Sequence, residues 1–307
     1  MRRWKTRISR VLAATIAAVQ IFGTALPARA AEENVQTQAQ TSQSQIHYVA
    51  FGDSITDGDH TYVNMVGNYL KTQYGQCEVT NFGVDGMQSK DLKEVLVNSS
   101  NPWHAIAVAQ LSDADIVTLD IGSNDILVTA YEVMADCFGC SIDQLGSVIS
   151  GWSERLSSQN FWVRMKAYME ALPIAYSLHN ELYNGKKMKQ AVSNYESNYV
   201  AILEAIKQMA PGASIYVGNL YNPFHNTPST YIGSYEVVNM ETVSNQYVLQ
   251  LNAIIDRQSA GCTVVDLYNT INDNKYLLGD PDNYDYNPHP NQTGHRAIAD
   301  KFIAAMK

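Results

Sequence analysis

The stretch HYVAFGDSITDG, residues 47–58, decides the fold because it joins a buried strand to a polar turn. Residues 47–51 are mostly apolar and include aromatic and β-branched side chains, which is typical of a strand covered on both faces. Gly52 and Asp53 interrupt this run, and Ser54 follows in the turn. A serine at such a place is either a nucleophile or an ordinary turn residue, and the rest of the chain decides between the two.

Four further segments resemble this strand, and amphipathic helical patterns lie between them. The segments are CEVTNFG (77–83), DIVTLDIG (115–122), SIYVGNL (214–220) and CTVVDLY (262–268). Strands that alternate with helices predict βαβ units and a parallel sheet covered on both faces. Right-handed crossovers then place the loops after the strands at one edge of the sheet. We therefore expect Ser54 to lie close to the loops that follow the second and third strands.

Three polar segments carry groups that a serine nucleophile needs. NFGVDGMQS (81–89) supplies glycines, whose backbone N–H groups can approach a ligand closely. GSND (122–125) supplies Asn124, an amide donor that does not titrate. NPHPNQTGH (287–295) holds His289 between two prolines, and histidine can act as a general base near neutral pH. Each segment alone also fits a plain turn or helix cap, so only their joint occurrence favours nucleophilic catalysis.

In their order along the chain, GDSITDG, NFGVDG, GSND and HPNQTGH resemble the four blocks of the GDSL, or SGNH, hydrolase family. The blocks run from about Tyr48 to the last helix. The resemblance implies an α/β fold, a flavodoxin-like three-layer α/β/α sandwich with five parallel strands in the order 2-1-3-4-5. It also implies a serine esterase that needs no metal and no cofactor. The α/β-hydrolase fold is disfavoured, because the chain has no G-x-S-x-G.

The resemblance assigns a role to one residue in each block. It implies Ser54 as the nucleophile and His289 as the general base. It also implies an oxyanion hole made by the backbone N–H groups of Ser54 and Gly86 and by the side chain of Asn124. These expectations rest on the match of the blocks in this sequence.

The acid of the triad departs from the family pattern. The family usually places it three residues before the histidine, where this chain has Tyr286. Asp285, Asp282 and a backbone carbonyl near Tyr286 are the groups left to orient the imidazole. We prefer Asp285 because it lies nearest in sequence and the loop could bulge by one residue. An orienting group fixes the histidine tautomer and stabilises the imidazolium.

The predicted activity is hydrolysis of a carboxylic ester through an acyl-enzyme. A small-molecule, lipid or acylated-glycan ester would suit such a site. Two alternatives stay open at this point. An acyltransferase would use the same residues and pass the acyl group to an acceptor alcohol. A catalytically inactive glycan-binding module of the same fold would use the tyrosine-rich part of the chain instead. Oligomeric state cannot be inferred from these patterns.

The first thirty residues have the pattern of a secretory signal peptide. Residues 1–10 are basic, residues 11–26 are apolar with one glutamine, and small residues at A-x-A spacing place cleavage near Ala30. The alternative is a membrane anchor, but the apolar run is shorter than the ~20 residues that comfortably span a bilayer. Residues 31–45 are rich in Gln, Thr and Ser and are expected to be disordered, so the hydrolase domain is predicted at 46–307. We therefore expect an extracellular protein.

The negative charge of the chain argues against nucleic acid as a partner. The formal charge is −9, and the first thirty residues carry six basic residues and no acidic ones, so removing them leaves −15. A chain this acidic lacks the electrostatic pattern of a nucleic-acid binder and is repelled by anionic membranes. No later segment is long and apolar enough to span a membrane, so no stable membrane insertion is expected.

One segment is too long for an ordinary connection. Residues from about 126 to 190 follow the third strand, are mostly helical in pattern and interrupt the regular spacing of strands. We predict a helical insertion there. The sequence leaves open whether it packs beside the catalytic edge or lies remote from it.

The four cysteines allow several arrangements. Cys137 and Cys140 are either a local disulfide or free thiols, and a zinc site would need two further ligands nearby, which the sequence does not show. In the strand order that the resemblance implies, Cys77 and Cys262 begin strands at opposite edges of the sheet. They would then lie too far apart for the ~6 Å Cα separation of a disulfide, so we expect both to be unpaired.

Overall fold

The computed structural model describes residues 45–225, 227, 229–272, 277–279 and 287–307. The signal peptide predicted at 1–30 lies outside these residues, and so does the leader predicted at 31–45, apart from Gln45. The two candidate triad acids, Asp285 and Asp282, also lie outside them.

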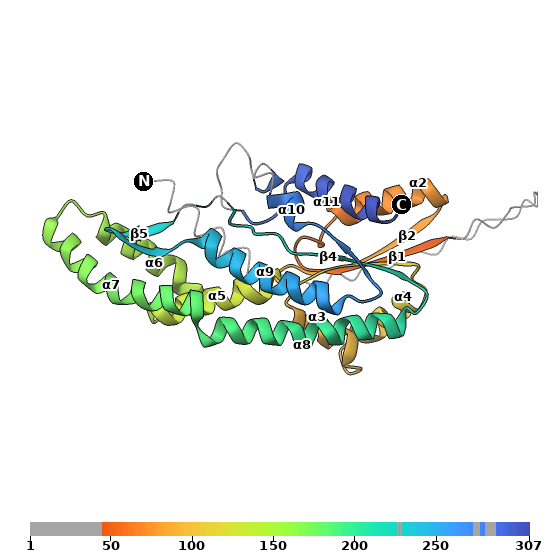
Figure 1. Cartoon of the computed structure of the whole chain (residues 1–307), viewed down its shortest axis with the longest axis horizontal. Helices are drawn as coiled ribbons and strands as arrows, with labels where there is room; N and C mark the ends of the chain where they lie inside the picture. Colours follow the sequence, from red (N-terminus) through yellow and green to blue (C-terminus); the bar gives the residue numbers. More distant parts are fainter. Residues whose placement is uncertain (1–44, 226, 228, 273–276, 280–286) are drawn as a thin grey trace, which may run out of the picture.

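The described chain alternates strands and helices, and Figure 1 shows their arrangement. The strands are β1 (Ile46–Gly52), β2 (Cys77–Gly83), β3 (Ile116–Asp120), β4 (Ser214–Gly218), β5 (Thr230–Ile232), β6 (Tyr235–Val238) and β7 (Thr263–Val265). The first helices are α2 (Tyr62–Tyr74), α3 (Ser89–Val97), α4 (His104–Ser112), α5 (Ser123–Phe138) and α6 (Ile142–Leu156). They are followed by α7 (Phe161–Asn184), α8 (Lys186–Met209), α9 (Met240–Gln258), α10 (Tyr268–Asn272) and α11 (Gln292–Ala305).

Five strands form one parallel sheet in the order β2-β1-β3-β4-β7. Since β7 is the fifth strand of this sheet along the chain, the order is 2-1-3-4-5, which confirms the prediction. The strand that carries the GDS turn pairs with β2 on one side and β3 on the other. The loops after these three strands therefore leave the sheet at the same edge.

A helical layer covers each face of the sheet. Successive residues of β1 point to opposite faces, as the two-residue period of a strand requires. Val49 and Phe51 lie in the buried cluster formed with α3, α4, α8 and α9. Tyr48 and Ala50 lie in the cluster formed with α2, α10 and α11. In Figure 1, α2, α10 and α11 lie on one side of the sheet and α3, α8 and α9 on the other. This is the predicted three-layer sandwich.

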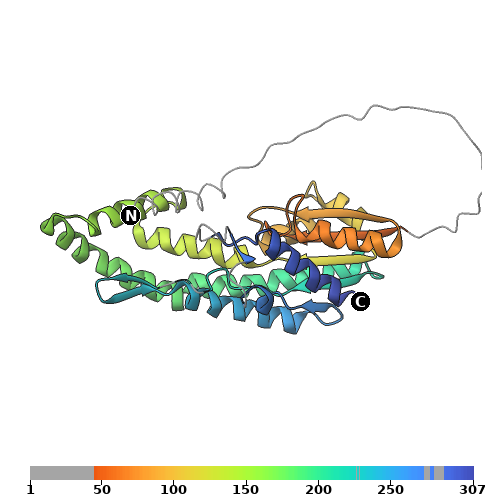
Figure 2. The same cartoon turned by 90° about the horizontal axis from the view of Figure 1, so that it is seen from above.

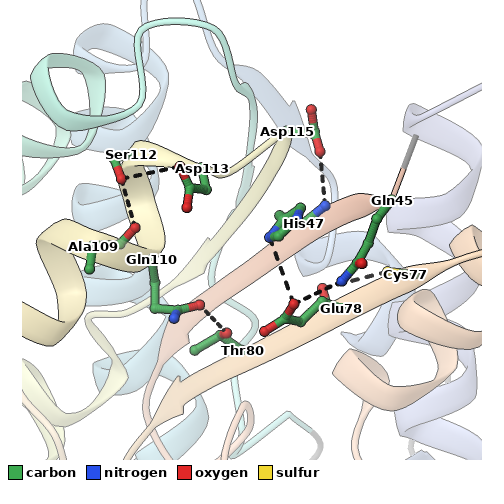
Figure 3. A network of polar contacts seen from close by, with 10 residues as sticks. All are labelled: Gln45, His47, Cys77, Glu78, Thr80, Ala109, Gln110, Ser112, Asp113 and Asp115. Atoms are coloured by element: carbon green, nitrogen blue, oxygen red, sulfur yellow. Dashed lines mark hydrogen bonds and ion pairs between the residues drawn. The ribbon is translucent and has the colours of Figure 1, made fainter. Parts of the chain in front are cut away.

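Polar contacts join the amino ends of the strands, at the edge opposite the GDS turn (Figure 3). The backbone N–H of His47 donates to the Asp115 carboxylate at 2.8 Å. The Glu78 carboxylate accepts from the Gln45 amide at 2.8 Å and lies 4.0 Å from the His47 ring. These contacts tie β1, β2 and the residue before β3 together and so help to fix the register of the strands.

The segment after β3 is helical and extends beyond the sheet. Figures 1 and 2 show α6, α7 and the β5–β6 hairpin at one end of an elongated molecule, with the parallel sheet toward the other end. α5 begins directly after β3, so the segment starts at the carboxyl edge of the sheet. A separate buried cluster holds it together, with members such as Val133 on α5, Leu178 on α7 and Val237 on β6. Among the described residues, no helix combines the length and apolar composition needed to cross a bilayer.

All four cysteine sulfurs are unpaired. For Cys77 and Cys262 this confirms the prediction, because β2 and β7 are opposite edges of the sheet. Of the two readings that the sequence leaves open for Cys137 and Cys140, the structure shows free thiols rather than a disulfide. The Sγ of Cys137 lies 3.6 Å from the Ser177 hydroxyl.

Candidate active site

The turn after β1 presents one serine side chain above a buried backbone. The N–H groups of Thr56 and Asp57 both donate to the Asp53 carbonyl oxygen at 3.0 Å. The N–H of Ile55 donates to the Asp53 carboxylate, also at 3.0 Å. Asp53, Ile55 and Thr56 are buried, whereas Ser54 is partly exposed. The turn is thus fixed by its own hydrogen bonds and leaves the Ser54 hydroxyl accessible.

Two glycines, Gly52 before the turn and Gly83 at the end of β2, allow neighbouring chain segments to approach the turn closely. A Cβ on Gly52 would overlap the Thr56 hydroxyl and lie 2.6 Å from the Asp120 carbonyl oxygen. A Cβ on Gly83, at the end of β2, would lie 2.5 Å from the backbone nitrogen of Asp57. The glycines therefore let the loops after β1, β2 and β3 pack against one another at the site.

Ser54 and His289 meet although 235 positions separate them in the sequence. Nε2 of His289 lies 2.9 Å from Oγ of Ser54. Nδ1 of the same ring lies 2.8 Å from Oδ1 of Asn287. Because Oδ1 is a carbonyl oxygen that can only accept, Nδ1 must carry the hydrogen. In the neutral imidazole Nε2 is then an acceptor that faces the Ser54 hydroxyl, which is the arrangement a general base needs.

The imidazole is held in its neutral form. Partial burial lowers the pKa of His289 below its usual value of 6.5, and the negative charge of Asp85 offsets part of this effect. A neutral histidine near physiological pH can take a proton from the Ser54 hydroxyl.

The Asn124 side chain joins the loop after β3 to the loop after β2 at Met87, the residue after Gly86. Gly86 occupies a tight turn in which the N–H of Met87 donates to the Val84 carbonyl at 3.1 Å, and its φ of 73° favours glycine. The Asn124 amide donates to the Met87 carbonyl at 3.2 Å and to the Asp53 carboxylate at 3.4 Å. A substrate oxyanion could replace the longer of these two contacts.

A cavity of about 80 Å³ opens beside Ser54 and His289, which both line it. Asn124 lines it, and most of the other lining side chains are apolar, many of them from α5 and α9. Gly86 is not among the lining residues, and its neighbour Met87 contacts the cavity residue Asn124. Within the described part of the chain, no group of three or more His, Cys, Asp or Glu side chains is placed to hold a metal ion.

Comparison with protein families agrees with this arrangement. The model of the GDSL-like lipase/acylhydrolase family matches residues 50–297, from β1 into α11. The chain belongs to this family. It is therefore a carboxylic ester hydrolase of the GDSL, or SGNH, type, as the sequence blocks indicate. The match includes Ser54, Asn124 and His289, although it does not by itself assign their roles.

Three relatives of this GDSL-like hydrolase show how far the likeness extends. The Bacillus subtilis (strain 168) protein YpmR, described as uncharacterized, is 22% identical over 287 residues, which cover 91% of this chain and 89% of YpmR. Among solved structures, the lipase Lip_vut3 from a goat rumen metagenome is 16% identical with a TM-score of 0.51, covering 85% of this chain and 97% of that one. Axe2, an acetylxylan esterase from Geobacillus stearothermophilus, is 18% identical with a TM-score of 0.50, covering 87% and 96%. These two structures share the fold.

The loop that carries the histidine of this hydrolase is anchored on two sides. The Tyr221 hydroxyl donates to the Pro288 carbonyl at 2.8 Å. The N–H of Gly279 donates to the His289 carbonyl at 2.9 Å. The Asn291 side chain then caps α11 by accepting from the backbone N–H groups of Thr293 and Gly294. The position of the imidazole is therefore fixed by the backbone contacts of Pro288 and His289 as well as by the contact of its ring with Asn287.

A contact between Ser89 and Asp125 joins the segments that follow β2 and β3, and the sequence did not predict it. The Asp125 carboxylate accepts from the backbone N–H of Ser89 at 2.9 Å and from its hydroxyl at 2.5 Å. Asn198 of α8 donates to the same hydroxyl at 3.1 Å. This network positions α3 against α5, and with it the loops that hold Gly86 and Asn124. The only sequence signal was that Asp125 follows Asn124 in GSND.

Asn287 is the other residue that the sequence analysis missed. The Asn-Pro-His pattern is a usable signal, because an Asn side chain often binds the backbone two residues later. Here Oδ1 of Asn287 accepts from the backbone N–H of His289 at 3.1 Å as well as from its ring.

We predict that Asn287→Ala lowers kcat/KM by about 10- to 100-fold, because the ring loses its fixed tautomer.

The matched variant Asn287→Asp tests whether Asn287 acts through the ring. A carboxylate at that position would stabilise the imidazolium, so this variant is expected to keep most of the activity and to move the acid limb of the pH–rate profile upward. An Asn287→Ala variant with parental kcat/KM and an unchanged profile would assign the orienting role to another group.

Two carboxyl groups, those of Asp53 and Asp120, lie buried near Ser54. Asp53 and Asp120 are each at most 2% exposed, and Oδ2 of Asp120 has no hydrogen-bond partner among the described residues. Removal from water raises the pKa of Asp120 well above its usual value, and the neighbouring Asp53 raises it further. Burial likewise raises the pKa of Asp53. Both carboxyl groups therefore hold their protons to higher pH than exposed carboxyl groups do.

The raised pKa of Asp120 predicts how the free energy of unfolding depends on pH. Because the folded pKa of Asp120 exceeds the unfolded value of about 3.9, the folded state holds a proton that the unfolded state releases, and stability falls as pH rises above about 4. Asp120→Asn removes that dependence. Relative to the parent, its free energy of unfolding should improve by about 1–3 kcal/mol between pH 4.5 and pH 7.5. Urea denaturation at both pH values measures this, with the exposed Asp113→Asn as control. An equal difference at both pH values would contradict it.

Proposed function

We propose that this chain is a secreted serine esterase that works through an acyl-enzyme on Ser54. The observation that carries the proposal is the 2.9 Å contact between Ser54 Oγ and a histidine nitrogen. That nitrogen is an acceptor because Asn287 holds the hydrogen on the other side of the ring. The secreted location rests on the signal-peptide pattern of residues 1–30.

In the first half of the reaction, Ser54 Oγ attacks the carbonyl carbon of an ester while His289 Nε2 takes its proton. The carbonyl oxygen becomes an oxyanion, which the backbone N–H groups of Ser54 and Gly86 and the Asn124 amide would stabilise. The intermediate then collapses, the bond to the alcohol oxygen breaks, and His289 passes its proton to the departing alcohol. The acyl group remains on Ser54.

In the second half, a water molecule replaces the alcohol. His289 takes a proton from the water as it attacks the acyl carbon, and the same donors stabilise the second oxyanion. Collapse returns the proton to Ser54 Oγ and releases the carboxylic acid. No step requires a group outside the chain, the ester and water.

The proposal is tested with the chain produced without residues 1–30. On p-nitrophenyl acetate it should release p-nitrophenol and acetate in equal amounts, whereas a non-catalytic module would release neither above the background rate. Location is tested separately by expressing the full chain. Recovery of protein that begins near residue 31 in the medium supports secretion, and retention of the full-length chain in the membrane would contradict it.

A further inference from the structure

A second and much larger cavity adjoins the catalytic one. It has a volume of about 550 Å³ and lies among α5, α6, α7 and the β5–β6 hairpin. Four side chains line both cavities: Tyr131 and Met134 from α5, Phe224 from the loop after β4, and Met240 at the start of α9. The two cavities therefore share a wall, and their lining residues together run from Ser54 along α5, a route that is called the path below.

The chemistry of the larger cavity is that of a hydrocarbon site. Its walls consist mainly of aliphatic and aromatic side chains, including Leu145, Trp152 and Leu178. No Asp, Glu, Lys or Arg is among the described residues that line it. The polar groups in the wall are a few hydroxyls and the indole N–H of Trp152, and the Tyr231 hydroxyl already donates to Glu236 at 3.1 Å. A sugar would lose hydrogen bonds to water there without regaining them, whereas an alkyl chain would lose none.

The path is long enough for a complete fatty acyl chain. α5 lines it from Asn124, at the oxyanion position, to Phe138 at the far end. The fourteen helical steps from Asn124 to Phe138, at about 1.5 Å each, span about 21 Å. The hydrocarbon core of a bilayer is ~30 Å thick, so the acyl chains of one leaflet span ~15 Å. An acyl chain attached to Ser54 would therefore fit along α5.

The geometry of the catalytic pair fixes which half of the ester takes this path. His289 must protonate the leaving oxygen, so the alcohol lies on the side of His289. The carbonyl oxygen must reach Asn124. The acyl group is then directed away from His289, and the apolar lining residues of α5 offer it a route to the shared wall at Met134.

We propose that this cavity binds the acyl chain of a long-chain fatty ester, so that the enzyme prefers such esters to acetyl esters. The inference rests on the proposed function of Ser54 and adds the substrate class. An apolar space of this size between helices costs stability unless a ligand supplies the missing contacts. Each methylene that enters it is expected to improve kcat/KM by up to about fourfold until the chain reaches the end of the path.

A matched pair of substitutions on α6 tests the assignment. Ser153 lines the cavity and is partly exposed, whereas Ser147 lies on the same helix, is exposed and is not among the lining residues. Ser153→Phe places a ring in the path, and Ser147→Phe adds the same ring outside it. Because Ser153 borders an open space, the larger side chain should be tolerated better than in a packed core.

The measurement is kcat/KM on p-nitrophenyl acetate, octanoate, laurate and palmitate. The parent is expected to favour laurate over acetate by at least about 100-fold. Ser153→Phe should lower the laurate value by about tenfold or more and leave the acetate value within about twofold, which also shows that it folds. Ser147→Phe should match the parent on all four. Acetate as the best substrate, or an equal loss on acetate and laurate in Ser153→Phe, would overturn the inference.

Laurate binding, measured by isothermal titration calorimetry, separates this inference from the proposed function. If no ester is turned over but laurate binds the parent and binds Ser153→Phe at least about tenfold more weakly, the cavity assignment holds and the esterase proposal fails. If acetate is turned over and laurate binds the parent no better than Ser153→Phe, the esterase stands and the acyl-chain assignment fails.

Discussion

Ser54→Ala is expected to lower kcat on p-nitrophenyl acetate by at least about 10⁴-fold, because the acyl-enzyme cannot form without the Oγ atom. Ser54 is partly exposed, and its hydroxyl contacts the ring of His289. Loss of the hydroxyl leaves the turn intact, because Asp53 holds it through backbone contacts. The melting temperature of the variant should therefore stay within a few degrees of the parent.

A neighbouring serine provides the control. Ser123 lines the same catalytic cavity, and the proposed mechanism gives its hydroxyl no role. Ser123→Ala is expected to keep kcat within about tenfold of the parent. A Ser54→Ala variant that retains parental turnover while remaining folded would remove Ser54 from the mechanism.

Removal of the base is the second large effect. His289→Ala should lower kcat/KM by about 10⁴-fold, because Ser54 then has no acceptor for its proton. The loop itself is held through the Pro288 carbonyl, so the variant is expected to fold. A loss of less than about tenfold would show that another group takes the proton.

The pH–rate profile of the parent carries an independent signature of His289. Activity needs the neutral imidazole, so kcat/KM should rise with pH and level off at an inflection below 6.5, since burial lowers the pKa of His289. The charge of Asp85 raises that pKa, so Asp85→Asn should move the inflection further down. Profiles measured from about pH 4 to about pH 9 test both shifts. An inflection above 6.5 in the parent would contradict the burial argument.

The sequence predicted that the loops after β1, β2 and β3 lie together, because the carboxyl ends of parallel strands lie at the same edge of a sheet. Five β-branched or aromatic runs separated by helical patterns specify a sheet whose loops open at one edge. Ser54 and Asn124 follow neighbouring strands of that sheet, so their proximity follows from topology alone. His289 lies before the last helix, and the family blocks indicated its place. Its 2.9 Å distance from Ser54 came only from the structure.

Side-chain networks were harder to predict than strands. The contact of Ser89 with Asp125 joins residues 36 positions apart and has no periodic signal. The contact of Asn287 with His289 is local, but the family pattern places an acid before the histidine and so favours a carboxylate over an amide. The two candidate acids, Asp285 and Asp282, lie outside the described residues.

The β5–β6 hairpin shows a different reason for a missed element. Its turn, Gly233-Ser234, is a recognisable two-residue hairpin loop, and Gly233 has a φ of 63°. The strands that flank it have three and four residues, too few for an alternating pattern to stand out. The hairpin is stabilised by packing on α7, where His179 Nδ1 lies 3.2 Å from the Val237 carbonyl oxygen. Such tertiary support is not visible in the local sequence.

The most direct test of the account is the site of covalent labelling by a fluorophosphonate probe. The account predicts that the probe reacts with an activated serine, that peptide mass spectrometry places the adduct on Ser54, and that both Ser54→Ala and His289→Ala abolish labelling. Adduct on another serine, or no adduct on a folded protein that still hydrolyses p-nitrophenyl acetate, would contradict it.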